Sequence, residues 1–239
     1  MRFETVVRTH VGCRRKVNED AVLARPDLGL WAVADGMGGH HAGDVASALV
    51  VEQLAAGAPG IRLPDRIEEV RRQLEAANGR LVALARSDDG QRTIGSTVAV
   101  LLLGDGGFAC LWAGDSRGYR ARAGVLRQLT HDHSLVQELV DIGEITQAEA
   151  REHPNANVIT RAVGANPGLE IDVVQGEVAA EDVFLLASDG LTRLAGEDEL
   201  LEALEASDLE AAAERLVDLC LQRGAPDNLS FVMLRVRPD

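Results

Sequence analysis

The amino-acid sequence predicts an α+β protein whose sheets are mostly antiparallel. Short runs rich in Val, Leu and Ala, which are typical of strands, come in groups separated by helical segments and do not alternate one by one with helices. Two of these runs, 96–103 and 108–113, flank Asp105-Gly106, a turn dipeptide typical of β-hairpins. Because parallel strands need long crossover connections, this order favours antiparallel pairing over a doubly wound parallel sheet.

The expected strands are short apolar runs bounded by turn residues. Aromatic residues make up only 3% of the chain, so the core has to be built mainly from aliphatic side chains. The strand runs occupy 5–9, 21–24, 28–34, 96–103, 108–113, 118–122, 170–176, 182–187 and 229–236.

Two helices are expected between the first and second groups of strands. Residues 43–56 are apolar on most sides, so this helix should be buried. The next helix begins at Pro64-Asp65, and Glu68 follows three residues after the aspartate, as in a capping box. Its apolar residues recur three and four positions apart, which places them on one face. These residues are Ile67, Val70, Leu74, Ala77, Leu81 and Leu84.

Further helices are expected in the second half of the chain. The polar segment 129–164 carries two short helical patterns, and Thr146 with Glu149 resembles a capping box for the second. A longer helix begins at Ser207 and ends at Gly224. Its buried stripe consists of Leu209, Ala212, Ala213, Leu216, Val217 and Cys220.

Composition limits the classes of protein that fit. The 239 residues are 46% hydrophobic and 26% charged, which suits one globular domain over 1–239 and excludes extensive disorder. The net charge of −14 disfavours nucleic acid and anionic membranes as partners. The longest aliphatic run, 98–103, is too short to cross a bilayer. Three widely spaced cysteines and the lack of a signal-peptide pattern predict reduced thiols in a cytoplasmic protein. We expect a monomer.

Several acidic residues stand where an apolar run ends, and these are the candidates for chemistry. Asp35, Asp115 and Asp189 each follow such a run, and Asp227 directly precedes the last one. Taken singly, each is more often a turn residue, as at Asp105. If strand ends from distant segments converge, however, the carboxylates form an all-oxygen site that suits Mg²⁺ or Mn²⁺ rather than Zn²⁺.

Two further candidates carry positive or titratable groups. Arg15 lies in a charged cluster that ends at Asp20, and its guanidinium has the geometry for a two-pronged contact with a phosphate. The alternative for this cluster is a solvated charge run. His40 follows the glycine-rich loop after Asp35 and is a candidate for acid–base chemistry.

Taken together, these motifs resemble the metal-dependent protein phosphatases of type 2C, in their compact bacterial form. The motifs lie in order over nearly the whole chain. They are Arg15-x-x-Asn18-Glu19-Asp20, Asp35-Gly-Met-Gly-Gly39, Gly95-Ser-Thr97, Gly114-Asp115-Ser116-Arg117, Leu129-Thr-x-x-His133-Ser134, His153-Pro154, Thr160-Arg161-Ala-x-Gly164, Ser188-Asp189-Gly190 and Asp227-Asn228.

The resemblance implies an antiparallel β-sandwich with helices on both outer faces and a dinuclear metal site at one end. It also implies a mobile flap over about 134–163. The activity implied is hydrolysis of phosphoserine and phosphothreonine in proteins by a metal-activated water, with two Mn²⁺ or Mg²⁺ ions and a third, weaker site.

The resemblance further assigns ligands. Asp35 would bridge the two ions, Asp189 and Asp227 would complete one of them, and the Gly36 carbonyl would bind the other. Asp20 would hold waters of that second ion.

Other residues take roles by the same resemblance. Glu19 would assist Asp20, and the third ion would use Asp115 and share Asp189. Arg15 would hold the substrate phosphate. Met37 stands where animal members have a histidine that acts as general acid, which leaves His40 as the candidate for that role.

The chain departs from the family pattern in the flap, where Asn155-Ala156-Asn157 stands in place of an arginine. The partners implied are phosphoproteins and a Hanks-type Ser/Thr kinase that the phosphatase opposes. The stretch 28–35 looks like members associated with type VI secretion. Two alternatives stay open, an inactive binding module of the same fold and a hydrolase of a small phosphoester.

Overall fold

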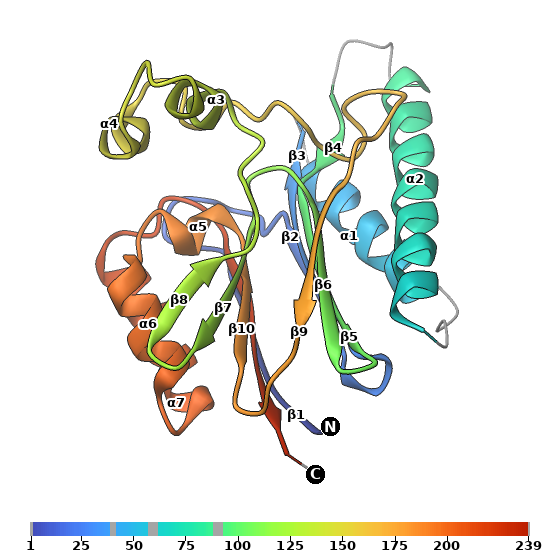
Figure 1. Ribbon diagram of the computed structural model, residues 1–239. Helices are drawn as coiled ribbons and strands as arrows, with labels where there is room; N and C mark the ends of the chain where they lie inside the picture. Colours follow the sequence, from blue (N-terminus) through green and yellow to red (C-terminus); the bar gives the residue numbers. More distant parts are fainter. Residues whose placement is uncertain (1, 39–41, 57–61, 88–92, 239) are drawn as a thin grey trace.

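Two antiparallel sheets packed face to face form the middle of the computed structural model, with helices on both outer faces (Figure 1). The structure describes residues 2–38, 42–56, 62–87 and 93–238. The helices are α1 (Ala42–Ala55), α2 (Leu63–Ser87), α3 (Leu135–Asp141), α4 (Gln147–Glu152), α5 (Asp189–Thr192), α6 (Glu197–Glu205) and α7 (Leu209–Gln222), with a 3₁₀ turn at Pro26–Leu28.

Both sheets are antiparallel throughout, which confirms the predicted fold class. The first has the order β1 (Arg2–His10), β11 (Leu229–Arg237), β10 (Val183–Ala187), β7 (Arg117–Arg122) and β8 (Val125–Gln128). The second has the order β2 (Asp20–Arg25), β3 (Leu30–Met37), β5 (Val98–Gly104), β6 (Gly107–Ala113) and β9 (Asp172–Glu177), and β4 (Gly95–Ser96) pairs with β3.

Burial on both faces explains why the central strands are apolar without interruption. In β3, Trp31 and Val33 pack in the core between the two sheets. Their neighbours Ala32 and Ala34 pack on the other side, against α1 and α2. Because successive side chains of a strand point to opposite faces, a strand covered on both sides needs apolar residues at every position.

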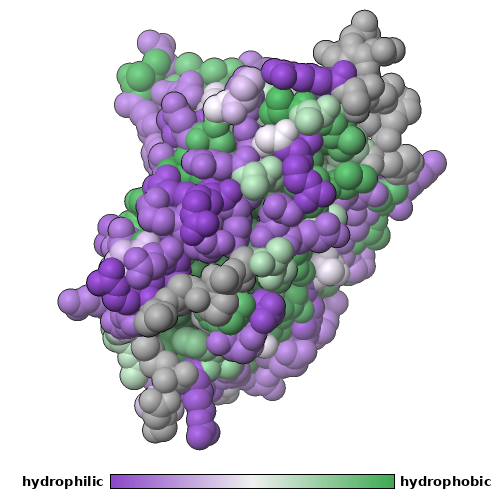
Figure 2. All heavy atoms as spheres, turned by 90° about the vertical axis from the view of Figure 1, so that its right-hand side faces the viewer, coloured by the Kyte–Doolittle hydropathy of each residue, from purple (hydrophilic) through white to green (hydrophobic). Residues whose placement is uncertain are grey.

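Helices α1 and α2 cover the second sheet, and α6 and α7 cover the first (Figure 1). The predicted buried stripes of α2 and α7 are confirmed, except that Leu84 is 40% exposed near the end of α2. Figure 2 views the molecule from the side of α2 and shows a largely hydrophilic surface with smaller apolar patches. No helix in the described ranges has the length and apolarity needed to cross a membrane.

Some boundaries differ from the predicted ones. The α7 cap is Asp208, whose carboxylate accepts from the Ala211 amide at 3.0 Å, and not Ser207. The capping box of Thr146 and Glu149 at α4 is confirmed. Strand β8 and helix α6 were not predicted, because β8 has only four residues, two of them exposed, and α6 has a glycine N-cap and an acidic first turn.

Asp105 has a second role besides its turn. It adopts a left-handed backbone with φ 55°, as the hairpin requires. Its carboxylate also accepts a hydrogen bond of 2.8 Å from the Leu63 amide at the first residue of α2. The residue that the sequence analysis treats as a simple turn therefore also satisfies an open donor at a helix N-terminus.

Replacing Asp105 by alanine should destabilise the protein for two reasons. The substitution removes this hydrogen bond, and alanine tolerates the positive φ of the turn less well than aspartate does. We expect Asp105→Ala to lower the free energy of unfolding by about 1–2 kcal/mol. Asp105→Asn keeps an accepting oxygen and tolerates positive φ, so it should cost less than the alanine variant. Urea denaturation measures both, and equal costs would contradict the capping role.

Candidate metal centre

Five aspartates from distant segments meet at one end of the sandwich. Asp20 opens β2 and lies directly opposite Asp35 across the β2–β3 ladder. Asp115 follows β6, Asp189 follows β10 as the first residue of α5, and Asp227 precedes β11. Each carboxylate is close enough to others of the group to act on their ionisation.

The cluster strongly disfavours full ionisation. Burial, together with the charges of Asp189 and Asp227, raises the pKa of Asp20 to about 7. Burial raises the pKa of Asp115 to about 7 as well, with repulsion from Asp189 adding to it. The pKa of Asp35 lies well above its usual value, because it is buried among the other four carboxylates. Groups that repel in this way are stabilised by cations.

Asp20 shows the clearest sign of an absent partner. One oxygen, Oδ2, accepts a hydrogen bond of 2.9 Å from the Ser188 hydroxyl. The other, Oδ1, is buried without any hydrogen-bond partner. A buried carboxylate oxygen that lacks a donor is costly, and a hard cation or its bound waters would satisfy it.

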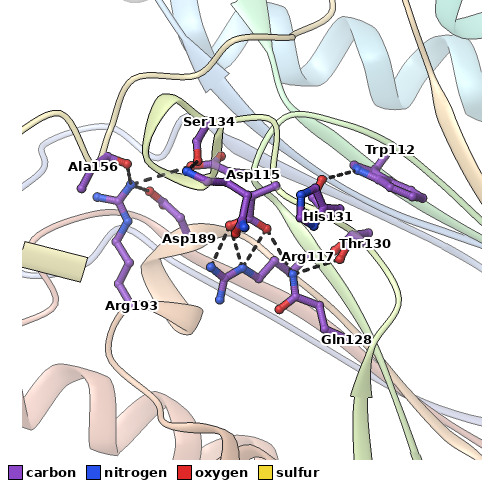
Figure 3. Close-up of polar contacts among 12 residues, drawn as sticks. Trp112, Asp115, Arg117, Gln128, Thr130, His131, Ser134, Ala156, Asp189 and Arg193 are labelled. Atoms are coloured by element: carbon purple, nitrogen blue, oxygen red, sulfur yellow. Dashed lines mark hydrogen bonds and ion pairs between the residues drawn. The ribbon is translucent and has the colours of Figure 1, made fainter. Parts of the chain in front are cut away.

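Two arginines hold carboxylates of the cluster. The Arg15 Nη2 lies 2.8 Å from Asp227 Oδ2, and the arginine side chain is 49% exposed. The Arg193 Nη2 lies 2.9 Å from Asp189 Oδ2 and 3.7 Å from Asp115 Oδ2. Figure 3 shows Arg193 between Asp189 and the backbone of Ala156. Arg15 is predicted from the sequence, but Arg193 is not, because its only sequence signal is its position four residues after Asp189.

The backbone around Gly36 is packed too closely for any side chain. A β-carbon there would lie 1.9 Å from the Gly43 carbonyl oxygen and 2.6 Å from that of Glu19. The Glu19 carbonyl accepts from the Gly36 amide at 3.0 Å and from the Ser47 hydroxyl at 2.6 Å. This packing fixes the β2–β3 end that carries Asp35.

Asn228 ties three segments together at the same end. Its Oδ1 accepts from the Glu19 amide, and its Nδ2 donates to the carbonyls of Val11 and Val17. Asn228 is buried, and a β-carbon on Gly190 would collide with its carbonyl oxygen at 1.8 Å. Asn228 and Gly190, which belong to the quoted motifs, therefore help to position the neighbouring Asp227 and Asp189.

Behind Asp115 lies a buried polar support. Gly114 has φ 114°, and its amide donates to His133 Nδ1 at 3.2 Å, while the His133 amide donates to the Gly114 carbonyl at 3.0 Å. Arg117 holds both oxygens of Asp132 in a paired contact. The segment 129–134, quoted for its resemblance without a role, thus fixes the turn that carries Asp115.

His40 lies outside the described residues, so its predicted role as an acid stays a prediction. Met37 ends β3 and pairs with Gly95 across the β3–β4 bridge. The Glu19 carboxylate lies against α1, since a β-carbon on Gly43 would stand 2.5 Å from its Oε1.

The donor set fits divalent hard cations. The side chains are carboxylates without thiolates or imidazoles among them, which suits Mn²⁺ and Mg²⁺. Within the described ranges, no three acidic, histidine or cysteine side chains already stand as close as they would around a bound ion. In this structure Arg15 and Arg193 occupy two of the carboxylates instead.

The metal-free protein should lose stability as the pH rises. A carboxyl whose pKa is raised on folding binds its proton more tightly in the folded state than in the unfolded chain. Its contribution is complete below its ordinary pKa of 3.8 and is lost as the pH rises through about 7. In EDTA, we therefore expect the Tm to fall by several degrees between about pH 5 and pH 8.

Scanning calorimetry measures this effect. Mn²⁺ added at the high end of the range should restore the Tm, because a ligand of the folded state stabilises it. Asp115→Asn, which removes one of the raised pKa values, should flatten the pH dependence in EDTA. A Tm that stays constant in EDTA would contradict the crowded cluster.

Comparisons with known proteins agree with this geometry. A family model described as Protein phosphatase 2C matches residues 13–230. The chain is 38% identical over 232 residues to the serine/threonine protein phosphatase PstP of Mycobacterium tuberculosis. That match covers 96% of this chain and 44% of PstP, so the chain spans less than half of that relative.

Solved structures are similar as well. PppA, described as a key regulatory component of T6SS in Pseudomonas aeruginosa, superposes with a TM-score of 0.91 at 43% identity and covers 98% of both chains. The catalytic domain of PstP in complex with two manganese ions gives 0.88 at 36% identity over 99% of both chains. Since the family model matches residues 13–230, which is most of the sequence, the chain belongs to the protein phosphatase 2C family.

Proposed function

We propose that the chain is a protein serine/threonine phosphatase that uses two Mn²⁺ or Mg²⁺ ions. The observation that carries the proposal is the convergence of five aspartates at one end of the sandwich, with an unpartnered buried oxygen on Asp20. The similar catalytic domain that binds two manganese ions supports it.

In this proposal, Asp35 bridges the two ions, and Asp189 and Asp227 complete the first. The Gly36 carbonyl, together with Asp20 and Glu19, serves the second. When bound, such a pair of cations makes a water nucleophilic near neutral pH and stabilises charge on the phosphoryl group. The chain's own contribution is to hold these oxygens rigidly on strand ends, so that little reorganisation is needed when charge develops.

Arg15 is assigned to the substrate phosphoryl group. It stands at the edge of the cluster, half exposed, with one nitrogen on Asp227. A guanidinium has five N–H donors, so donors remain for a phosphate that approaches from solvent. Its contact with Asp227 orients it toward the same end of the sandwich.

We further infer one catalytic domain over 1–239, with a flap over 134–163 that includes α3 and α4. Figure 1 places these helices beyond the end of the sandwich, on the side of α5. The substrates we propose are phosphoproteins, with a Hanks-type Ser/Thr kinase and its targets as partners and the cytoplasm as the compartment. The similarity to PppA supports a role in type VI secretion.

An inactive binding module is the weaker reading, because such a protein has no need to keep five clustered carboxylates, four of which have pKa values raised by burial and mutual repulsion. A hydrolase of small phosphoesters would share the metal site, so only substrate comparison separates it from the proposal.

The proposal is tested by turnover of a phosphothreonine peptide and of nucleotides, with Mn²⁺ and in EDTA. We expect Mn²⁺-dependent turnover of the peptide. Asp35→Asn and Asp189→Asn should each lower kcat by about a hundredfold or more, because an electrostatic site loses one charge. Asp105→Asn is the matched control, since that residue is also an aspartate before a glycine, and it should keep kcat.

Equal losses at Asp35 and Asp105 would show that the aspartates act only as turn residues. Full activity in EDTA would contradict the proposed dependence on metal ions. Turnover of nucleotides in place of the peptide would favour the small-ester alternative.

Removing the Arg15 guanidinium should weaken substrate binding and spare metal binding. We expect Arg15→Ala to raise KM for the phosphopeptide about ten- to a hundredfold, as for the loss of a charged hydrogen bond. Arg15→Lys should recover part of the loss, because an ammonium cannot make a paired contact. Steady-state kinetics beside a calorimetric Mn²⁺ titration measures both properties, and a wild-type KM in Arg15→Ala would refute the phosphate-binding role.

A further inference from the structure

Arg193 connects the aspartate cluster to the flap. Its Nη2 lies 2.9 Å from Asp189 Oδ2 and 3.7 Å from Asp115 Oδ2. The same guanidinium donates to the Ala156 carbonyl at 3.3 Å and to the Asn157 side-chain oxygen. Figure 3 shows the Arg193 side chain reaching toward Asp189 and the backbone of Ala156. One guanidinium therefore holds two carboxylates of the cluster and two oxygens of the flap.

The surroundings leave Arg193 room to move. Its side chain is 39% exposed, whereas those of Asp115 and Asp189 are 8% and 15% exposed. A cavity of about 120 Å³ beside it is lined by residues of α3 and α4 as well as by Thr192 and Ala156. The two carboxylates stand at strand ends. The arginine side chain is longer and more exposed, so it is the group that can move away from the contact.

A divalent cation between Asp115 and Asp189 would compete with this guanidinium. The guanidinium lies against both carboxylates, so an ion bound between them would stand close to it, and at such short range the two cations would repel each other. Binding of the ion therefore requires Arg193 to leave, and its departure also removes its contacts with Ala156 and Asn157. By thermodynamic linkage, the contacts of Arg193 with the flap weaken binding of the ion by the same factor by which the ion weakens those contacts.

We propose that Arg193 is a positioning residue that ties the flap at Ala156 and Asn157 to the metal centre and gives way when a divalent cation binds between Asp115 and Asp189. The inference rests on the proposed function, together with the third, weaker ion at Asp115 and Asp189 that the family resemblance implies. It gives the flap two arrangements, one held by the arginine and one released by the third ion. The flap segment Asn155-Ala156-Asn157 lacks the arginine that the family pattern has there. It is contacted instead by Arg193, which directly follows α5.

The test combines a calorimetric Mn²⁺ titration with hydrogen exchange of the amides of Ala156 and Val158. Both amides bond locally within the flap, to His153 and Asn155. In wild type, we expect exchange at these amides to speed up as the weaker Mn²⁺ site fills. In Arg193→Ala, that site should bind Mn²⁺ about 5- to 10-fold more tightly, and exchange should be fast with or without the third ion.

Two further variants separate coupling from simple loss of a contact. Arg193→Lys keeps a charge near Asp189 but cannot reach all four oxygens, so exchange should rise while the Mn²⁺ affinity gains less than in the alanine variant. Arg237→Ala is the matched control, because Arg237 is also 39% exposed and also pairs with two carboxylates, Glu4 and Glu181, at the end of β11 opposite to Asp227. It should change neither reading.

The outcomes are distinct. Two results in Arg193→Ala would overturn the inference: an unchanged affinity of the weaker Mn²⁺ site, or amide exchange that still depends on Mn²⁺. Either would do so even if exchange became faster, because the loss of a purely structural contact also speeds up exchange. Absence of any weak Mn²⁺ site in both wild type and Arg193→Ala also overturns it. If wild type binds no Mn²⁺ at all and does not turn over the phosphopeptide, the proposed function itself fails.

Discussion

Mutual repulsion among five clustered carboxylates is the constraint on which the rest of the structure depends. Burial and neighbouring charge raise the pKa values of Asp20, Asp35 and Asp115 above their ordinary range. A protein can keep such a cluster only if its backbone is fixed by contacts elsewhere. Here the sandwich provides them, because each aspartate stands at the end or the start of a strand, and these strands are largely buried except for β2, which is half-buried.

The close backbone approaches at this end follow from the same constraint. Gly36 and Gly190 stand where a β-carbon would collide with carbonyl oxygens of neighbouring segments, so only glycine lets the chains meet. Asn228 then satisfies the backbone groups of the loops that come together there. The motif residues beside the aspartates are thus explained by backbone packing, and the aspartates themselves by the cations they attract.

Charge also links the centre to the flap. Two arginines compensate part of the cluster in this structure, and they differ in what else they touch. Arg15 is half exposed and open to solvent, which suits an anionic substrate. Arg193 is shared with the flap, so the state of the cluster and the position of the flap are coupled through one side chain. The acidic net charge of −14 makes such local cations the natural anchors for a phosphoprotein.

The sequence by itself determined the α+β class, the buried stripes of α2 and α7, and the set of aspartates at strand ends. These follow from periodicity and from local turn chemistry, which are visible in a single chain. It could not reveal Arg193, or that Asp105 caps α2, because both contacts join segments far apart in the sequence. Short elements such as β8 were missed for a related reason, since four residues, two of them exposed, carry almost no periodic signal. Which carboxylates share a site, and how strongly they repel, was decided only when the tertiary structure brought their strand ends together.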